Sequence, residues 1–181
     1  YIKALSKGDR NVVVRENRNS LVVEVYRSIR SNLPFVLSKG QNVIMFTSTT
    51  SGEGKTCIAS NLAASIAFAG KKVVIVGLDI RKPRLAALFN LADTNKGISN
   101  FFTRTDDDYE YLETLIQKSD VSPNLDIIAA GPVPPNPAEL LEKNNLVTAI
   151  EYLKKKYDYV LLDTAPIGVV SDTLTIGKVA D

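Results

Sequence analysis

The sequence predicts an α/β fold in which a mostly parallel β-sheet is flanked by helices. Short apolar runs of β-prone residues alternate along the chain with segments of helical periodicity, and these runs are 43–46, 73–76, 125–129 and 159–162. Strands that alternate with helices pair in parallel, because each helix brings the chain back to the edge where the previous strand began. The chain has 181 residues, of which 45% are hydrophobic, and this suits one domain with a substantial core.

Composition excludes several classes of protein. The 22 basic and 20 acidic residues leave a net charge of +2, so nothing global points to nucleic acid as a partner. One cysteine and no histidine exclude a disulfide framework and a zinc site built on His or paired Cys. The low cysteine content favours a reducing compartment, most simply the cytoplasm, as the location of the protein. No apolar run approaches the roughly 18 residues of a membrane-spanning helix. We therefore expect this fragment to be soluble.

The N-terminal region divides into two parts. Residues 1–19 are polar and charged, with a turn at 8–11, and are expected to form a loosely ordered arm before a domain at 20–181. Ser20 is a suitable N-cap for the first helix. In that helix Glu24, Arg27 and Arg30 are spaced by three and so lie along one side, with Glu24 close enough to Arg27 for an ion pair. From spacing alone, a solvated charged face is the simpler interpretation.

The segment 43–56, VIMFTSTTSGEGKT, turns from an apolar strand to Thr, Ser and Gly and then into a helix. Gly52 and Gly54 allow the backbone amides to curl inward, and Lys55 and Thr56 fall on the first helical turn. An amide-lined loop at a helix N-terminus, where about half a positive charge gathers, is a cradle for phosphate. Lys55 would reach the β- and γ-phosphates, and the Thr56 hydroxyl would ligate Mg²⁺.

This loop departs from the full P-loop pattern at one position, because Thr49 stands where a glycine is expected six residues before the lysine. A mobile Ser/Thr/Gly turn is the alternative interpretation. As a nucleotide-binding segment it comprises Ser51, Gly52, Glu53, Gly54, Lys55, Thr56 and Cys57.

Two further carboxylates follow predicted strands. Asp79 comes just after the run 73–76, and Asp163 comes just after the run 159–162. Because the carboxyl ends of parallel strands meet at one edge of the sheet, both side chains are expected near the phosphate cradle. There they can hold Mg²⁺, and Asp79 can accept a proton from an incoming hydroxyl. The alternative for each is a capping residue of a turn or helix.

The remaining segments predict shorter elements. Helical candidates lie at 85–89, 112–118 and 146–157, and another helix begins at 172–181. The acidic run 106–108 beside two tyrosines is interpreted as a solvated loop. Asn136, Pro137 and Glu139 have the order of a capping box with proline at the first helical position, so a helix is expected to start there.

Taken together, the motifs resemble a known family. TSTTSGEGKT, VVIVGLDIRKP and YDYVLLDTAP, with Glu24-x-x-Arg27-x-x-Arg30 and GPVPPNPAELL, are similar to the cytoplasmic kinase domain of bacterial tyrosine kinases (BY-kinases). These kinases regulate capsule or exopolysaccharide synthesis and export, and they resemble the MinD and ParA group of P-loop ATPases. The resemblance covers nearly all of residues 15–181.

The resemblance implies a P-loop NTPase fold and an ATP- and Mg²⁺-dependent protein-tyrosine autokinase. The catalytic residues would be Lys55, Asp79 and Asp163, and the metal ligands Thr56, Asp79 and Asp163, with Arg81 as an additional nucleotide contact. Glu24, Arg27 and Arg30 would contact a neighbouring copy in a ring-like oligomer. Other implied partners are a membrane or periplasmic polysaccharide co-polymerase and protein substrates with tyrosines, at the cytoplasmic face of the inner membrane.

The sequence departs from the family at two places. Gly77 stands where the family carries the first of two aspartates, so only Asp79 remains in that motif. The last tyrosine is Tyr159, inside a predicted strand, so the domain is expected to be truncated before the tyrosine-rich tail. Two other functions therefore stay open, a MinD/ParA-like ATPase switch and a nucleotide-controlled assembly module without kinase activity. The loop lacks the additional lysine near its start that is typical of the switch.

Overall fold

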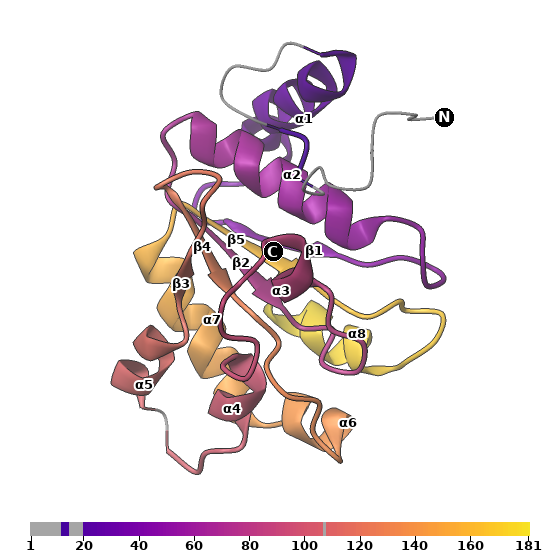
Figure 1. The fold of residues 1–181 in the computed structure, drawn as a ribbon, viewed down its shortest axis with the longest axis vertical. Coiled ribbons are helices and arrows are strands. Elements are labelled where there is room, and N and C mark those ends of the chain that lie inside the picture. Colours follow the sequence, from indigo (N-terminus) through magenta and orange to yellow (C-terminus); the bar gives the residue numbers. More distant parts are fainter. Residues whose placement is uncertain (1–11, 15–19, 107) are drawn as a thin grey trace.

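A computed structural model describes residues 12–14, 20–106 and 108–181 (Figure 1). These residues form a five-stranded sheet with the order β1-β5-β2-β4-β3. Its strands are parallel apart from β3, which pairs antiparallel with β4. The strands are β1 Val43–Phe46, β2 Val73–Gly77, β3 Gln117–Lys118, β4 Leu125–Ile128 and β5 Tyr159–Asp163. The predicted α/β class, with a mostly parallel sheet, is confirmed.

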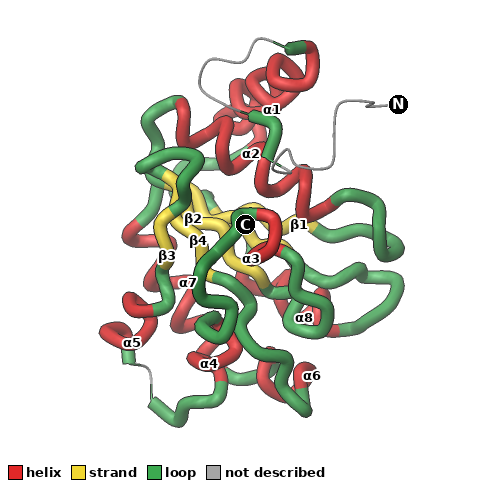
Figure 2. Tube along the Cα trace, viewed as in Figure 1, coloured by secondary structure: helices red, strands yellow, loops and turns green. Residues whose placement is uncertain are grey.

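Helices cover both faces of the sheet (Figures 1 and 2). The helices are α1 Leu21–Val36, α2 Lys55–Phe68, α3 Leu85–Leu88, α4 Ile98–Phe102, α5 Tyr109–Thr114, α6 Pro137–Leu141, α7 Asn144–Lys156 and α8 Asp172–Ile176, with a 3₁₀ helix at Gly177–Val179. On one face α2 lies against the sheet and α1 lies outside α2. On the other face α4, α5 and α7 pack beneath the strands.

Two hydrophobic clusters, one on each face, explain why the central strands are apolar throughout. In β2, Val73 and Ile75 pack with α2, whereas Val74 and Val76 pack with α4 and α7. Successive strand residues point to opposite faces, so a strand that is covered on both faces needs apolar residues at every position. The sheet is therefore a rigid base for the loops at its ends.

The helix α2 is buried between the sheet and α1. Small side chains at Ala59, Ala63 and Ala67 are fully buried, which allows the helix to approach the strands closely. On its other side, Arg30 of α1 donates from Nη1 to the carbonyl oxygen of Ser65 at 2.8 Å. This contact fixes α1 on the helix that follows the phosphate-binding loop.

Most predicted elements agree with the structure, and two local predictions were wrong. The segment 112–118 is not one helix, because α5 begins earlier, where the Asp108 carboxylate accepts from the Tyr111 amide at 2.9 Å, and β3 follows it. The capping box of α6 is also absent. The Asn136 amide nitrogen instead donates to the Glu139 carboxylate at 2.7 Å, so the two side chains bind each other rather than the backbone.

The N-terminal prediction is tested only in part. The turn at 8–11 and most of the arm lie outside the described residues. Within the described range, Val12 and Val14 are buried, and the amides of Val13 and Val14 donate to the Asn61 side-chain oxygen at 2.8 and 3.0 Å. The Ser20 hydroxyl accepts from the Val23 amide at 3.3 Å, which confirms the N-cap of α1. None of the helices described is both long and apolar enough to cross a membrane.

Candidate functional site

The strand register brings three segments together at the carboxyl end of the sheet. Asp163, the last residue of β5, lies beside Phe46 at the end of β1 and beside Gly77 at the end of β2. The loop that leads to α2 starts at Phe46, and the loop with Asp79 starts at Gly77. The amides of Leu78 and Asp79 donate to the Asp163 carbonyl oxygen at 2.7 and 3.1 Å. The loop with Asp79 is therefore fixed to the end of β5, and the phosphate-binding loop starts beside that end, where Phe46 pairs with Asp163.

The phosphate-binding loop turns at two glycines. Gly52 has φ 94° and Gly54 has φ 92°, and both angles lie in the left-handed region that favours glycine. A Cβ added at either position would meet no heavy atom within 4 Å, so the requirement for glycine is conformational rather than steric. Gly54 is the N-cap of α2, and Lys55 and Thr56 begin the helix, as predicted.

Glu53 stabilises this loop from within. Its carboxylate accepts from the amides of Thr49 and Thr50 at 3.1 and 3.2 Å and from the Thr50 hydroxyl at 2.9 Å. The hydrogen bond from that hydroxyl, followed by those from the amides, lowers the pKa of Glu53. The Glu53 side chain thus holds the loop at Thr49, the position where the common motif has glycine. It does not line the cavity described below, although the sequence grouped it with the nucleotide-binding residues.

Lys55, Thr56, Asp79 and Asp163 come together at the start of α2. Lys55 Nζ lies 3.3 Å from Asp79 Oδ2 and 4.0 Å from Asp163 Oδ1. The Thr56 hydroxyl donates to Asp163 Oδ1 at 3.1 Å. Residues from three separate segments of the chain are thus positioned as the sequence predicts.

Burial raises the pKa of Asp163 to about 6. The residue is only 2% exposed, and the charge of nearby Asp79 raises the pKa further, while Lys55 and the Thr56 hydroxyl act in the opposite direction. A buried carboxylate is costly to ionise without a compensating cation, so its charged form favours a nearby positive ion.

The donors at this point fit a magnesium ion. The Thr56 hydroxyl and the Asp163 carboxylate are both oxygen ligands, and the second carboxylate, on Asp79, is occupied by Lys55 and by the Lys82 amide at 3.1 Å. The described part of the chain contains no group of three or more His, Cys, Asp or Glu residues that could hold a metal. Mg²⁺ usually keeps several waters and binds one or two protein carboxylates together with substrate phosphates, so one hydroxyl and one carboxylate are donors that it can use.

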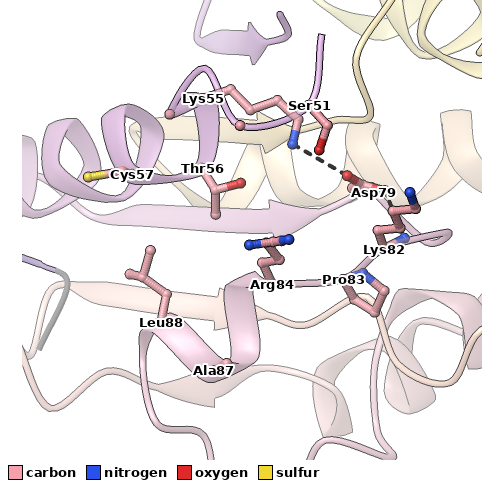
Figure 3. A pocket seen from close by; sticks show the side chains of 12 residues that line it. Ser51, Lys55, Thr56, Cys57, Asp79, Lys82, Pro83, Arg84, Ala87 and Leu88 are labelled. Atoms are coloured by element: carbon pink, nitrogen blue, oxygen red, sulfur yellow. Dashed lines mark hydrogen bonds and ion pairs between the residues drawn. The ribbon is translucent and has the colours of Figure 1, made fainter. Parts of the chain in front are cut away.

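A cavity of about 470 Å³ opens beside these residues (Figure 3). It is lined by the predicted residues Ser51, Gly52, Gly54, Lys55, Thr56, Cys57 and Asp79. It is also lined by five residues that the sequence analysis missed, Lys82, Pro83, Arg84, Ala87 and Leu88. These residues could have been found from the sequence, because they follow closely after Asp79 and two of them are cations.

The other predicted site residues do not line this cavity. Asp163 contacts Thr56 and Lys55, which do line it. Arg81 forms a bidentate ion pair with the buried Asp172, at 2.6 Å from Nε to Oδ2 and 3.1 Å from Nη2 to Oδ1. It therefore joins the loop after β2 to the start of α8. Glu24 and Arg27 pair with each other on the exposed side of α1, and Arg30 contacts α2.

Comparison with known proteins identifies the family. Residues 41–176 match a family model described as an AAA domain. Over 177 residues the chain is 37% identical to the tyrosine-protein kinase YwqD of Bacillus subtilis (strain 168), and the match covers 97% of the chain and 72% of that protein. The chain belongs to the bacterial tyrosine-protein kinase family.

Two further relatives agree with this membership. The chain is 36% identical over 181 residues to a putative tyrosine-protein kinase in the cps region of Klebsiella pneumoniae, covering 97% of the chain but 24% of that longer protein. The solved kinase domain of the Escherichia coli tyrosine kinase ETK has a TM-score of 0.86 and 30% identity, covering 98% of the chain and 68% of that domain. This tyrosine-kinase family member thus has the fold of a solved kinase domain.

Proposed function

We propose that the chain is the catalytic part of an ATP-dependent protein-tyrosine kinase. The observation that supports this most directly is the convergence of Lys55, Thr56, Asp79 and Asp163 beside an open cavity at the N-terminus of α2. Family membership favours this activity over an ATPase switch or an assembly module, because the relatives compared above are named tyrosine kinases.

In this mechanism the loop residues Gly52 to Lys55 bind the phosphates of ATP. The backbone amides and the Lys55 ammonium stabilise negative charge on the γ-phosphoryl group and on the departing ADP. Thr56 and Asp163 would hold Mg²⁺, which neutralises phosphate charge when it is bound. The tyrosine oxygen forms a bond to the γ-phosphorus as the bond between that phosphorus and the β–γ bridging oxygen breaks, and the phenolic proton passes to Asp79.

Gly77 leaves Asp79 as the acidic residue of its motif. A Cβ at Gly77 would lie 3.1 Å from the Ala130 amide nitrogen and 3.4 Å from a Leu85 methyl group, so the end of β2 is closely packed here. Phosphoryl transfer depends mainly on positioning and charge stabilisation, so one carboxylate fewer is compatible with kinase activity.

Assembly and location are part of the same proposal. The paired Glu24 and Arg27, together with Arg30, would contact a neighbouring copy, so that one subunit phosphorylates tyrosines of another. Support comes from the exposure of the pair on α1, where the Glu24 side chain is 57% exposed. One relative is named as a putative tyrosine-protein kinase in the cps region of Klebsiella pneumoniae, and this supports a role in polysaccharide synthesis. A membrane co-polymerase would be the partner in that role. The domain would then lie at the cytoplasmic face of the inner membrane.

Incubation with γ-labelled ATP and Mg²⁺ tests the proposal. A kinase leaves acid-stable label on tyrosine, a switch releases phosphate, and an assembly module does neither. Lys55→Met is expected to abolish the tyrosine label, because it removes the cation that contacts the phosphates. Undiminished phosphotyrosine in this variant, or release of phosphate alone by the wild type, would contradict the proposal.

A further inference from the structure

The cavity beside Asp79 has two different walls. The phosphate-binding loop and the first turn of α2 form one wall. The other, which we call the acceptor wall, is formed by Lys82, Pro83, Arg84, Ala87 and Leu88 from the segment after β2 and from α3. Figure 3 shows the side chain of Arg84, the residue just before α3, pointing into the cavity and Lys82 beside Asp79. Both lie across the cavity from the backbone of the phosphate-binding loop.

The two cations of the acceptor wall are unsatisfied by the protein. Within the ranges that the structure describes, neither the Lys82 ammonium nor the Arg84 guanidinium takes part in an ion pair, whereas nearby Arg81 is held by Asp172. The backbone amide of Lys82 donates to Asp79 Oδ1 at 3.1 Å. This hydrogen bond fixes the backbone position from which the Lys82 side chain extends. Two unpaired cations at one cavity are suited to an anionic ligand.

The same wall also has an apolar surface. Pro83 and Ala87 are exposed to the cavity, and Leu88, 8% exposed, lies at its base. An apolar surface next to a carboxylate is suited to an aromatic ring whose hydroxyl must reach that carboxylate. At the opposite wall, Lys55, the loop amides and the start of α2 already stabilise the negative charge of a triphosphate.

From these observations, and on the basis of the proposed kinase function, we propose that the acceptor wall binds a tyrosine segment with acidic flanking residues. The tyrosine ring lies against Pro83 and Leu88 with its hydroxyl at Asp79. Aspartate or glutamate residues next to the tyrosine pair with Lys82 and Arg84. This wall would therefore determine which tyrosines the kinase phosphorylates.

The test uses two tyrosine peptides that differ only in their flanking residues, which are Asp and Glu in one and Asn and Gln in the other. The wild-type chain with Mg-ATP should phosphorylate the acidic peptide with a kcat/KM about tenfold higher, the size expected for two partly desolvated ion pairs. In Lys82→Gln/Arg84→Gln the ratio of the two kcat/KM values should fall to about one. Lys71→Gln, which removes an exposed lysine from the turn between α2 and β2, is the matched control and should keep the preference.

Binding measured separately from catalysis distinguishes this proposal from the kinase activity itself. Fluorescence anisotropy of the labelled peptides on the ADP-bound chain should show the same preference and the same loss in the double variant. If the acidic peptide binds more tightly than the neutral peptide but neither is phosphorylated, the kinase activity is contradicted and the proposed role of the acceptor wall is supported. Equal binding and phosphorylation of both peptides would overturn the acceptor wall alone. A weaker affinity of the double variant for ADP would assign Lys82 and Arg84 to the nucleotide, and this would also overturn it.

Discussion

Asp163 and Asp126 are both buried carboxylates on strands of the same sheet, and both have a lysine nearby, yet their surroundings differ. Asp126 lies near the start of β4, where its Oδ2 accepts from the Tyr157 hydroxyl at 2.7 Å and from Lys118 Nζ at 3.0 Å. Asp163 lies at the opposite end of the sheet, with the Thr56 hydroxyl at 3.1 Å and Lys55 Nζ at 4.0 Å. The contacts of Asp126 are thus shorter than those of Asp163. Asp126 also lines a second cavity, of about 180 Å³, whereas Asp163 reaches the cavity beside the phosphate-binding loop only through its contacts with Thr56 and Lys55, which line it.

This difference separates a structural carboxylate from one that can bind a ligand. Burial alone does not distinguish them, because Asp163 is 2% and Asp126 is 6% exposed. What distinguishes them is whether the surrounding side chains already stabilise the negative charge. The raised pKa of Asp163, about 6, reflects a charge that still lacks a sufficient partner.

The largest expected effect comes from Asp163→Asn. This change should lower the rate of tyrosine phosphorylation about 100-fold or more, because it removes a magnesium ligand from the transition state. The free energy of unfolding of the nucleotide-free chain should not fall, since a poorly compensated buried charge is lost. Phosphotyrosine formation and urea denaturation measure the two quantities. Near-normal activity of this variant would show that Asp163, like Asp126, has a structural role and does not bind the metal.

The reciprocal change, Asp126→Asn, should affect stability instead. The Tyr157 hydroxyl and Lys118 would lose a charged acceptor, and the free energy of unfolding should fall by about 2 kcal/mol. The kinetics of phosphorylation should stay unchanged, because this carboxylate is at the far end of the sheet. Urea denaturation and a kinase assay on the same preparation check this. A large loss of activity without a loss of stability would reverse the comparison.

The pH dependence sharpens the comparison further. The folded pKa of Asp163, about 6, lies above its ordinary value of 3.8, so between these pH values the folded chain binds the additional proton. The free energy of unfolding of the nucleotide-free chain should therefore contain a contribution that falls as pH rises from about 4 to 6. The affinity for Mg-ADP should change in the opposite direction and fall about fivefold between pH 6 and pH 5, because the ionised fraction of Asp163 falls by that factor. Melting temperatures with and without Mg-ADP measure both trends, and Asp163→Asn should remove them while Asp126→Asn keeps them.

The smallest effect is expected for Lys118→Gln. The Lys118 side chain is 75% exposed, so solvent screens its interaction with Asp126, and the free energy of unfolding should fall by less than about 1 kcal/mol. Lys55, with a side chain only 13% exposed, faces two carboxylates and the cavity. Urea denaturation of the Lys118 variant beside Asp126→Asn checks the magnitude. A loss as large as that of Asp126→Asn would mean that the lysine, rather than the Tyr157 hydroxyl, is the main partner of Asp126.

The sequence predicted the centre of the site because local patterns determine it. A strand, a glycine turn and a helix start place Lys55 and Thr56, and the rule that parallel strands end at one edge places Asp79 and Asp163 nearby. The partner of Arg81 could not be predicted in this way, since Asp172 is far away in the sequence and the two meet only through the tertiary fold. The limits of α3 were predicted to within one residue. Those of α5 were not, because so short a helix depends on packing more than on its own sequence, and the cavity wall near Arg84 also needed the structure.

The Asp163 carbonyl oxygen receives the amides of both Leu78 and Asp79, and this bond pair has a mechanical consequence. The backbone at Asp79 and the backbone at Asp163 cannot shift independently, because these hydrogen bonds join them. Any displacement caused by nucleotide binding must therefore move these two backbone segments together. A substitution that weakens the packing at the end of β5 would misplace both Asp79, the proposed proton acceptor, and Asp163, the proposed metal ligand.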